Sequence, residues 1–105
     1  MAFKHLSAAQ AKELMAGDTT VVADIRDENS FAQGHMPQAV HLSNANIGQF
    51  MIEKDFEQPI IVVCYHGISS QGAANYLIEQ GFEEVYSMDG GFDAWSKQFM
   101  DEIER

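Results

Sequence analysis

The chain has 105 residues, of which 46% are hydrophobic, and 16 acidic residues against six Lys and Arg give it a formal charge of −10. This length predicts one domain over residues 1–105 that buries about two-thirds of its unfolded surface. The charge repels phosphate backbones and anionic lipids, which argues against nucleic acid and membranes as partners. A single cysteine excludes an intrachain disulfide, a CxxC redox pair and multi-cysteine metal sites.

The compartment is the next property that the sequence bears on. The first residues contain no sustained apolar stretch of the kind a signal peptide needs, and the longest aliphatic run, 60–63, is far too short to span a bilayer. A lone cysteine also fits a reducing environment. We therefore expect a soluble, cytoplasmic protein.

Hydrophobic periodicity and turn residues predict alternating helices and strands. Ser7 is placed to cap the first helix, and Gly17 and Gly81 are placed to end the first helix and the helix after Cys64. In chain order we expect a helix over 8–15, a strand over 20–25, a helical turn over 30–33, a strand over 39–42, a helix over 43–54, a strand over 60–64, a helix over 69–80, a strand over 85–88 and a final helix that Gly90 and Gly91 open.

This alternation predicts an α/β fold, with a mostly parallel sheet covered by helices. In such sheets, ligands bind beyond the carboxyl ends of the strands. Cys64 occupies that position, since it ends the run of Ile and Val over 60–63 and precedes a helix. The final helix carries Phe92, Trp95 and Phe99 on one stripe, which we expect to pack on the sheet.

Cys64 is the strongest candidate for chemistry. A thiolate at the carboxyl end of a strand faces the N–H groups of the next helix, and these groups lower the pKa of a free thiol, which is near ~8.5. Gly67 would let the intervening backbone curl tightly, and Ser69 and Ser70 would donate hydroxyl hydrogen bonds or cap the helix. The competing interpretation is a buried structural thiol, because free cysteine is among the most buried residue types.

The next feature is a set of three segments: DIRD at 24–27 with SFAQGHMPQA at 30–39, VCYHGISS at 63–70, and VYSMDGGFDAW at 85–95. Together they resemble the rhodanese (thiosulfate sulfurtransferase) family in its single-domain bacterial form. The likeness covers nearly the whole chain and implies a rhodanese-like fold with a central five-stranded parallel sheet flanked by helices.

The resemblance also implies a reaction and the residues that carry it. Cys64 would take the outer sulfur of thiosulfate as a persulfide, release sulfite, and pass the sulfur to cyanide or to a thiol acceptor such as thioredoxin. No metal or organic cofactor is implied, and the four histidines lack ligand-like spacing. Substrate would be bound by the loop that follows the cysteine: Tyr65, His66, Gly67, Ile68, Ser69 and Ser70.

Asp24, Arg26 and His35 are expected to support the site. Arg26 resembles a family arginine that braces the site through ion pairs, and its carboxylate partner is left open among Asp24, Asp27 and Asp89. His35 is expected to fix a loop by hydrogen bonding. No fixed positive charge follows Cys64, where many rhodaneses carry arginine, so we expect modest affinity for thiosulfate. His66 either approaches the substrate or faces solvent.

Other functions compete with this hypothesis. A phosphatase or arsenate reductase of the related fold needs an arginine six residues after the cysteine, and Ser70 stands there instead. A non-enzymatic regulatory or binding module of the same fold would not need the cysteine. A persulfide carrier in a protein sulfur relay would use the same thiol, and the sequence does not separate it from small-molecule turnover.

Overall fold

In the computed structural model, which describes residues 2–105, one sheet has the strand order β1-β5-β4-β2-β3, and every neighbouring pair runs parallel. This confirms the predicted α/β fold with a five-stranded parallel sheet. Its strands are β1 (Lys4–Leu6), β2 (Val21–Asp24), β3 (Val40–His41), β4 (Ile60–Val63) and β5 (Val85–Met88).

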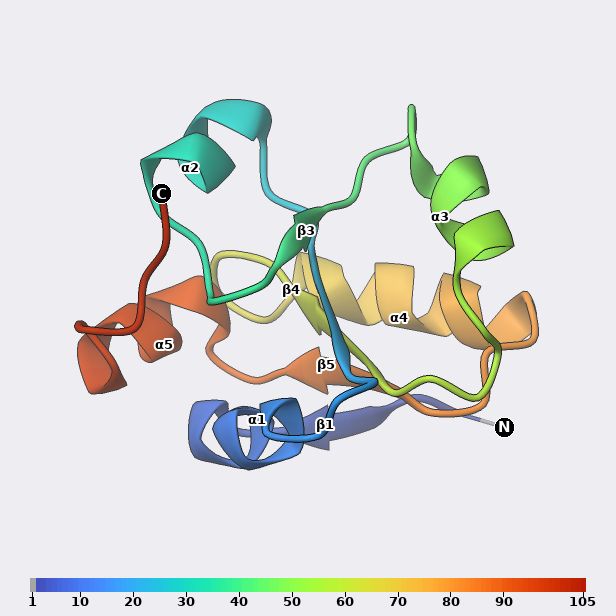
Figure 1. Cartoon of the computed structure of the whole chain (residues 1–105), viewed down its shortest axis with the longest axis horizontal. Coiled ribbons are helices and arrows are strands. Elements are labelled where there is room, and N and C mark those ends of the chain that lie inside the picture. The colour runs from blue at the N-terminus through green and yellow to red at the C-terminus, as the bar shows by residue number, and fades with distance from the viewer. Residues whose placement is uncertain (1) are drawn as a thin grey trace.

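Helices cover both faces of this sheet (Figure 1). They are α1 (Ala8–Met15), α2 (Glu28–Gln33), α3 (Ile47–Glu53), α4 (Ser69–Glu79) and α5 (Gly91–Gln98). One core cluster joins α3 and α4 to the sheet through Phe50 and Leu77, and the other joins α1 and α5 through Ala11 and Trp95. None of these helices, within residues 2–105, has the length and apolar character needed to cross a membrane.

Local hydrogen bonds explain where the first three helices begin. Ser7 caps α1 through a capping box with Gln10, as its position predicted. The second helix begins two residues earlier than expected because the Asp27 side chain accepts the Ser30 N–H. The third helix is shorter than the predicted 43–54, because residues 43–46 form a turn in which the Ser43 N–H donates to the Asn46 side chain.

The strand β1 has no counterpart in the sequence pattern. It is three residues long and only Leu6 is buried, so the strand lacks the alternation that reveals a longer one. It exists because it pairs with β5, with His5 opposite Ser87. Edge strands of this length depend on their partner rather than on their own hydrophobic pattern.

The central strands of the sheet bring three chain segments to one edge. All four residues of β4 are fully buried, and the strand pairs with β2 on one side and β5 on the other. Because the strands are parallel, the segments that follow β2, β4 and β5 leave the sheet at the same edge. Cys64 is the first residue beyond β4, and Asp24 lies opposite Val63 in the register.

Candidate active site

Cys64 follows β4 directly and precedes the loop that leads to α4, with 5% of its surface exposed. The loop 65–68 turns the chain through a left-handed conformation at Gly67 (φ +87°) and delivers it to Ser69, the first residue of α4. The sulfur is therefore enclosed by its own loop while it remains at the edge of the sheet. Burial alone disfavours a thiolate, so the reactivity of this thiol depends on the hydrogen-bond donors around it.

Three hydrogen-bonding groups converge on the Cys64 sulfur. The Gly67 N–H donates to Sγ at 3.0 Å, and the Ser70 N–H donates at 3.3 Å. The Ser70 hydroxyl oxygen lies 3.3 Å from the same sulfur. This arrangement binds an anion at the Sγ position, in the manner of an oxyanion hole.

The surroundings of Cys64 act in opposite directions on its pKa. Burial raises the pKa, because a thiolate loses hydration there. Hydrogen bonds from the Ser70 hydroxyl and from the backbone N–H groups of Ser70, Gly67 and His66 outweigh burial, so the pKa of the Cys64 thiol lies below its usual value. At neutral pH the thiol is consequently more ionised than a free cysteine.

The start of α5 holds this loop from the outside. The Phe92 N–H donates to the Cys64 carbonyl at 2.8 Å, and the Asp93 N–H donates to the Tyr65 carbonyl at 3.0 Å. Gly91 makes this approach possible, since its φ is +59° and a Cβ there would lie 2.4 Å from both carbonyl oxygens. The geometry of the loop thus depends on a segment about 25 residues further along the chain.

The remaining loop side chains point outward. Tyr65 and His66 are exposed and their rings stack with centroids 4.5 Å apart. Ile68 is 75% exposed, and Ser69 is exposed too. Neither serine caps α4, whose N-cap is Ile68 without a side-chain cap bond. Of the two hydroxyls, that of Ser70 reaches the sulfur.

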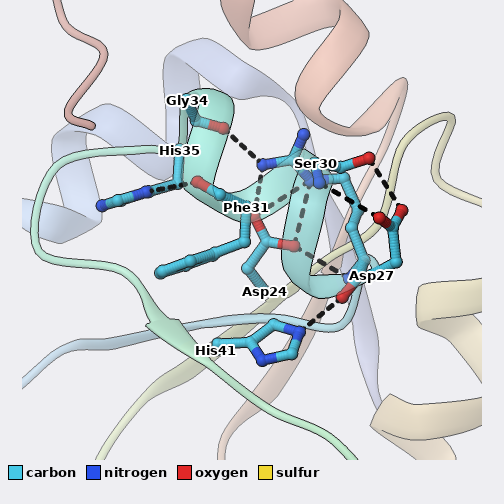
Figure 2. Close-up of polar contacts among 8 residues, drawn as sticks. Asp24, Asp27, Ser30, Phe31, Gly34, His35 and His41 are labelled. Atoms are coloured by element: carbon cyan, nitrogen blue, oxygen red, sulfur yellow. Dashed lines mark hydrogen bonds and ion pairs between the residues drawn. The ribbon is translucent and has the colours of Figure 1, made fainter.

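Arg26 is held at the end of β2 by Asp24 and Gly34, whose polar contacts Figure 2 shows. Among the three carboxylates that the sequence left open, Asp24 is its partner: Nη2 lies 2.8 Å from Oδ2, and both side chains are nearly buried. The same nitrogen donates to the Gly34 carbonyl at 2.7 Å, and the guanidinium covers the Phe92 ring. These contacts join the end of β2, the end of α2 and the start of α5.

His35 and residues near the C-terminus pack beside α2, close to Arg26. The His35 ring stacks on Phe31 and its Nδ1 lies 2.8 Å from the Phe31 carbonyl oxygen. Its backbone pairs with Glu104, which brings residues near the C-terminus beside α2 (Figure 1). A hollow of about 270 Å³ opens here beside Tyr65, and both arginines of the chain, Arg26 and Arg105, line it. Fixed positive charge near the loop therefore comes from outside the loop.

Two residues of this site escaped the sequence analysis. Ser87 lies within β5, is fully buried, and its hydroxyl oxygen lies 2.8 Å from that of Ser70. Gly91 was expected only to open a helix. A serine in a short strand carries no local signal of such a contact, because the contact follows from the pairing of β4 with β5. The left-handed backbone of Gly91 is equally invisible without its neighbours.

Comparisons with known proteins agree on one family. A family model described as a rhodanese-like domain matches residues 7–98. The chain is 63% identical over 105 residues, all of both chains, to the thiosulfate sulfurtransferase GlpE of Pseudoalteromonas translucida (strain TAC 125).

Solved structures share the fold at low sequence identity. The reduced CoADR-RHD of Bacillus anthracis superposes with a TM-score of 0.84 at 19% identity, over 98% of this chain and 18% of that one. SSP1007 of Staphylococcus saprophyticus gives 0.80 at 19% identity, over 98% of this chain and 100% of that one. At such identities, these similarities concern the fold.

Proposed function

The chain belongs to the rhodanese-like domain family, and from this membership we infer that it is a thiosulfate sulfurtransferase that carries sulfur on Cys64. Its full-length relative with 63% identity is named for that activity. The observation that supports Cys64 as the carrier is the convergence of the Gly67 N–H, the Ser70 N–H and the Ser70 hydroxyl on Sγ. Within the one-cysteine chain, no other thiol is available.

The proposed reaction has two half-reactions. The Cys64 thiolate attacks the outer sulfur of thiosulfate, the S–S bond of thiosulfate breaks, and sulfite leaves with the bonding electron pair. The enzyme then holds a persulfide, Cys64–S–S⁻. A nucleophilic acceptor attacks the terminal sulfur, the new S–S bond breaks, and Cys64 returns as a thiolate. With cyanide as the acceptor the product is thiocyanate, and with a thiol it is a persulfide.

The loop would serve both half-reactions through the same property. The resting thiolate, the persulfide and the leaving thiolate are all anions, and fixed N–H groups stabilise anions without reorganising. Gly67 and Ser70 supply these groups, while burial keeps competing water away from the sulfur. Tyr65, Ile68 and Ser69 would then shape the entrance rather than bind charge, because their side chains are exposed.

Our proposal for the donor and acceptor is supported by the charge and exposure of the loop side chains. The loop contains no Lys or Arg, so thiosulfate would bind with modest affinity. Tyr65 and Ile68 present exposed apolar side chains on the loop that follows Cys64, and these would favour a protein thiol, such as a thioredoxin, over cyanide as the working acceptor. In this proposal the protein works in the reducing cytoplasm, with neither nucleic acid nor membrane as a partner.

Intact mass spectrometry tests the role of Cys64. Incubation with thiosulfate should add one sulfur, about 32 Da, and cyanide should remove it, since the activated thiolate accepts and then releases sulfur. Cys64→Ser should gain no mass and produce no thiocyanate, while its circular dichroism spectrum stays that of the wild type. Thiocyanate production by the folded Cys64→Ser protein would refute Cys64 as the carrier.

A further inference from the structure

Ser87 is a fully buried polar residue within β5. Within residues 2–105, fully buried polar or charged side chains are confined to Asp24, Ser70 and Ser87. Asp24 is paired with Arg26, whereas the two serines are paired with each other, with their hydroxyl oxygens 2.8 Å apart. Ser70 also contacts the Cys64 sulfur, so the three side chains form one row from the sheet to the reactive atom.

Counting hydrogens gives this row a direction. Each serine hydroxyl has one hydrogen to donate and lone pairs to accept with. A thiolate has no hydrogen, so Ser70 must donate to Sγ, and its oxygen is then free to accept the Ser87 hydrogen. In the opposite direction, Ser70 would donate to Ser87. The Ser87 hydrogen would then have no acceptor, because among the described residues the Ser87 hydroxyl forms a hydrogen bond with Ser70 alone.

We propose that Ser87 is a positioning residue for sulfur transfer, whose buried hydroxyl donates to Ser70 Oγ and thereby turns the Ser70 hydrogen toward the Cys64 sulfur. This inference rests on the proposed function of Cys64. Ser87 touches neither the sulfur nor the substrate and acts through Ser70 alone. The Ser87–Ser70 bond strengthens when Ser70 donates to an anion, because hydrogen bonds in a row polarise one another.

The burial of Ser70 and Ser87 strengthens the hydrogen bond between them. Ser70 and Ser87 are both 0% exposed, so water does not compete for either hydroxyl. The register fixes Ser87 opposite Val62 on β4, two residues before Cys64, and holds the donor in place from the sheet. In a buried setting the satisfied row favours the thiolate, while any arrangement that leaves a hydroxyl unpaired carries a cost.

The experiment measures the pKa of Cys64 from the ultraviolet absorbance of the thiolate, together with kcat/KM for thiosulfate as a function of pH. Ser87→Ala removes the hydroxyl, and Ser87→Thr restores one at the same Cβ. Thr20→Val is the matched control, because it also deletes a hydroxyl hydrogen bond, to the Leu14 carbonyl, but at the amino end of β2. The double variant Ser70→Ala/Ser87→Ala tests whether Ser87 acts through Ser70.

Other ionisable groups at this edge are unchanged in all these variants. They include Asp24 at the end of β2, Arg26 after it, Tyr65 and His66 in the loop, and Asp89 and Asp93 around the start of α5. A difference in the Cys64 titration between wild type and Ser87→Ala therefore comes from the loss of the hydrogen bond between Ser87 and Ser70.

Ser87→Ala should raise the Cys64 pKa by about 0.3–0.6 unit and lower kcat/KM about two- to fourfold at pH values below that pKa, with little change above it. Thr20→Val should leave the thiol titration of wild type unaltered. If Ser87→Thr folds as wild type by its melting curve, it should recover most of the shift. In the Ser70→Ala background, loss of the Ser87 hydroxyl should move the pKa by no more than about 0.1 unit, because nothing then connects Ser87 to the sulfur.

Two results would overturn the proposal for Ser87. One is an Ser87→Ala titration that coincides with wild type, and the other is a shift of equal size in the Ser70→Ala background. Failure of the proposed function has a different signature: wild type would take up no sulfur from thiosulfate, although the Ser87 variants still shifted the thiol titration.

Discussion

Replacing Gly91 with alanine tests whether the active-site loop is shaped by its contact with α5. Gly91 sits at φ +59°, and a Cβ at this position would lie 2.4 Å from the carbonyl oxygens of Cys64 and Tyr65. Both obstacles are backbone atoms, so neither can rotate away. The start of α5 and the loop must therefore separate, which strains the bonds from the Phe92 and Asp93 N–H groups.

The expected loss of stability has two parts. The left-handed backbone costs an L-residue about 1–2 kcal/mol, and overpacking of a close contact costs about 1–3 kcal/mol. We expect Gly91→Ala to lower the free energy of unfolding by about 2–5 kcal/mol and the melting temperature by at least about 8 °C. Denaturant unfolding followed by Trp95 fluorescence measures the free energy.

The same change should impair the chemistry, which distinguishes this site from an ordinary strained glycine. Gly67 packs against the segment before α5, where a Cβ would lie 2.7 Å from the Gly90 nitrogen. A displaced α5 therefore moves the Gly67 N–H away from the sulfur, and the Cys64 pKa should rise. Gly72→Ala is the control: its added Cβ meets no described atom within 4 Å, and it should stabilise α4 by about 0.5–1 kcal/mol. A Gly91→Ala protein that unfolds like wild type and keeps its thiol pKa would show that the contact with α5 does not shape the loop.

The remaining predictions concern ionisable side chains away from the sulfur. Arg26→Met should reduce the free energy of unfolding by about 3–5 kcal/mol, because it leaves the buried Asp24 carboxylate unpaired. Lys97→Met breaks an exposed pair and should cost no more than about 0.5 kcal/mol; equal losses in the two variants would contradict the role of burial. A hydrogen bond to Glu84 raises the pKa of Tyr86 to about 12 from 10.0, so the unfolded chain loses this proton first and stability should fall between those pH values. Tyr86→Phe should remove that part of the decline in urea unfolding at alkaline pH, and an unchanged decline would show that another group causes it.

Local sequence patterns specified most of the secondary structure. The run of Ile and Val over 60–63, the capping box at Ser7 and the turn glycines act within a few residues of themselves, so their effects can be read along the chain. The junction of strand, cysteine and helix likewise placed Cys64 at the carboxyl edge of a parallel sheet. These patterns did not predict β1, which forms by pairing with the distant strand β5. They also did not predict the turn over 43–46, which a hydrogen bond to the Asn46 side chain stabilises.

Patterns along the chain therefore predict the fold class, the position of the thiol and the loop that follows it. Which groups reach the sulfur depends on tertiary packing, which selects the N–H groups of Gly67 and Ser70 among the loop amides and one of two adjacent serine hydroxyls. It also selected Asp24 as the partner of Arg26 and brought Ser87 to Ser70. The physical reason is that these contacts depend on strand register and on the close approach of backbones, which are properties of pairs of segments rather than of any one segment.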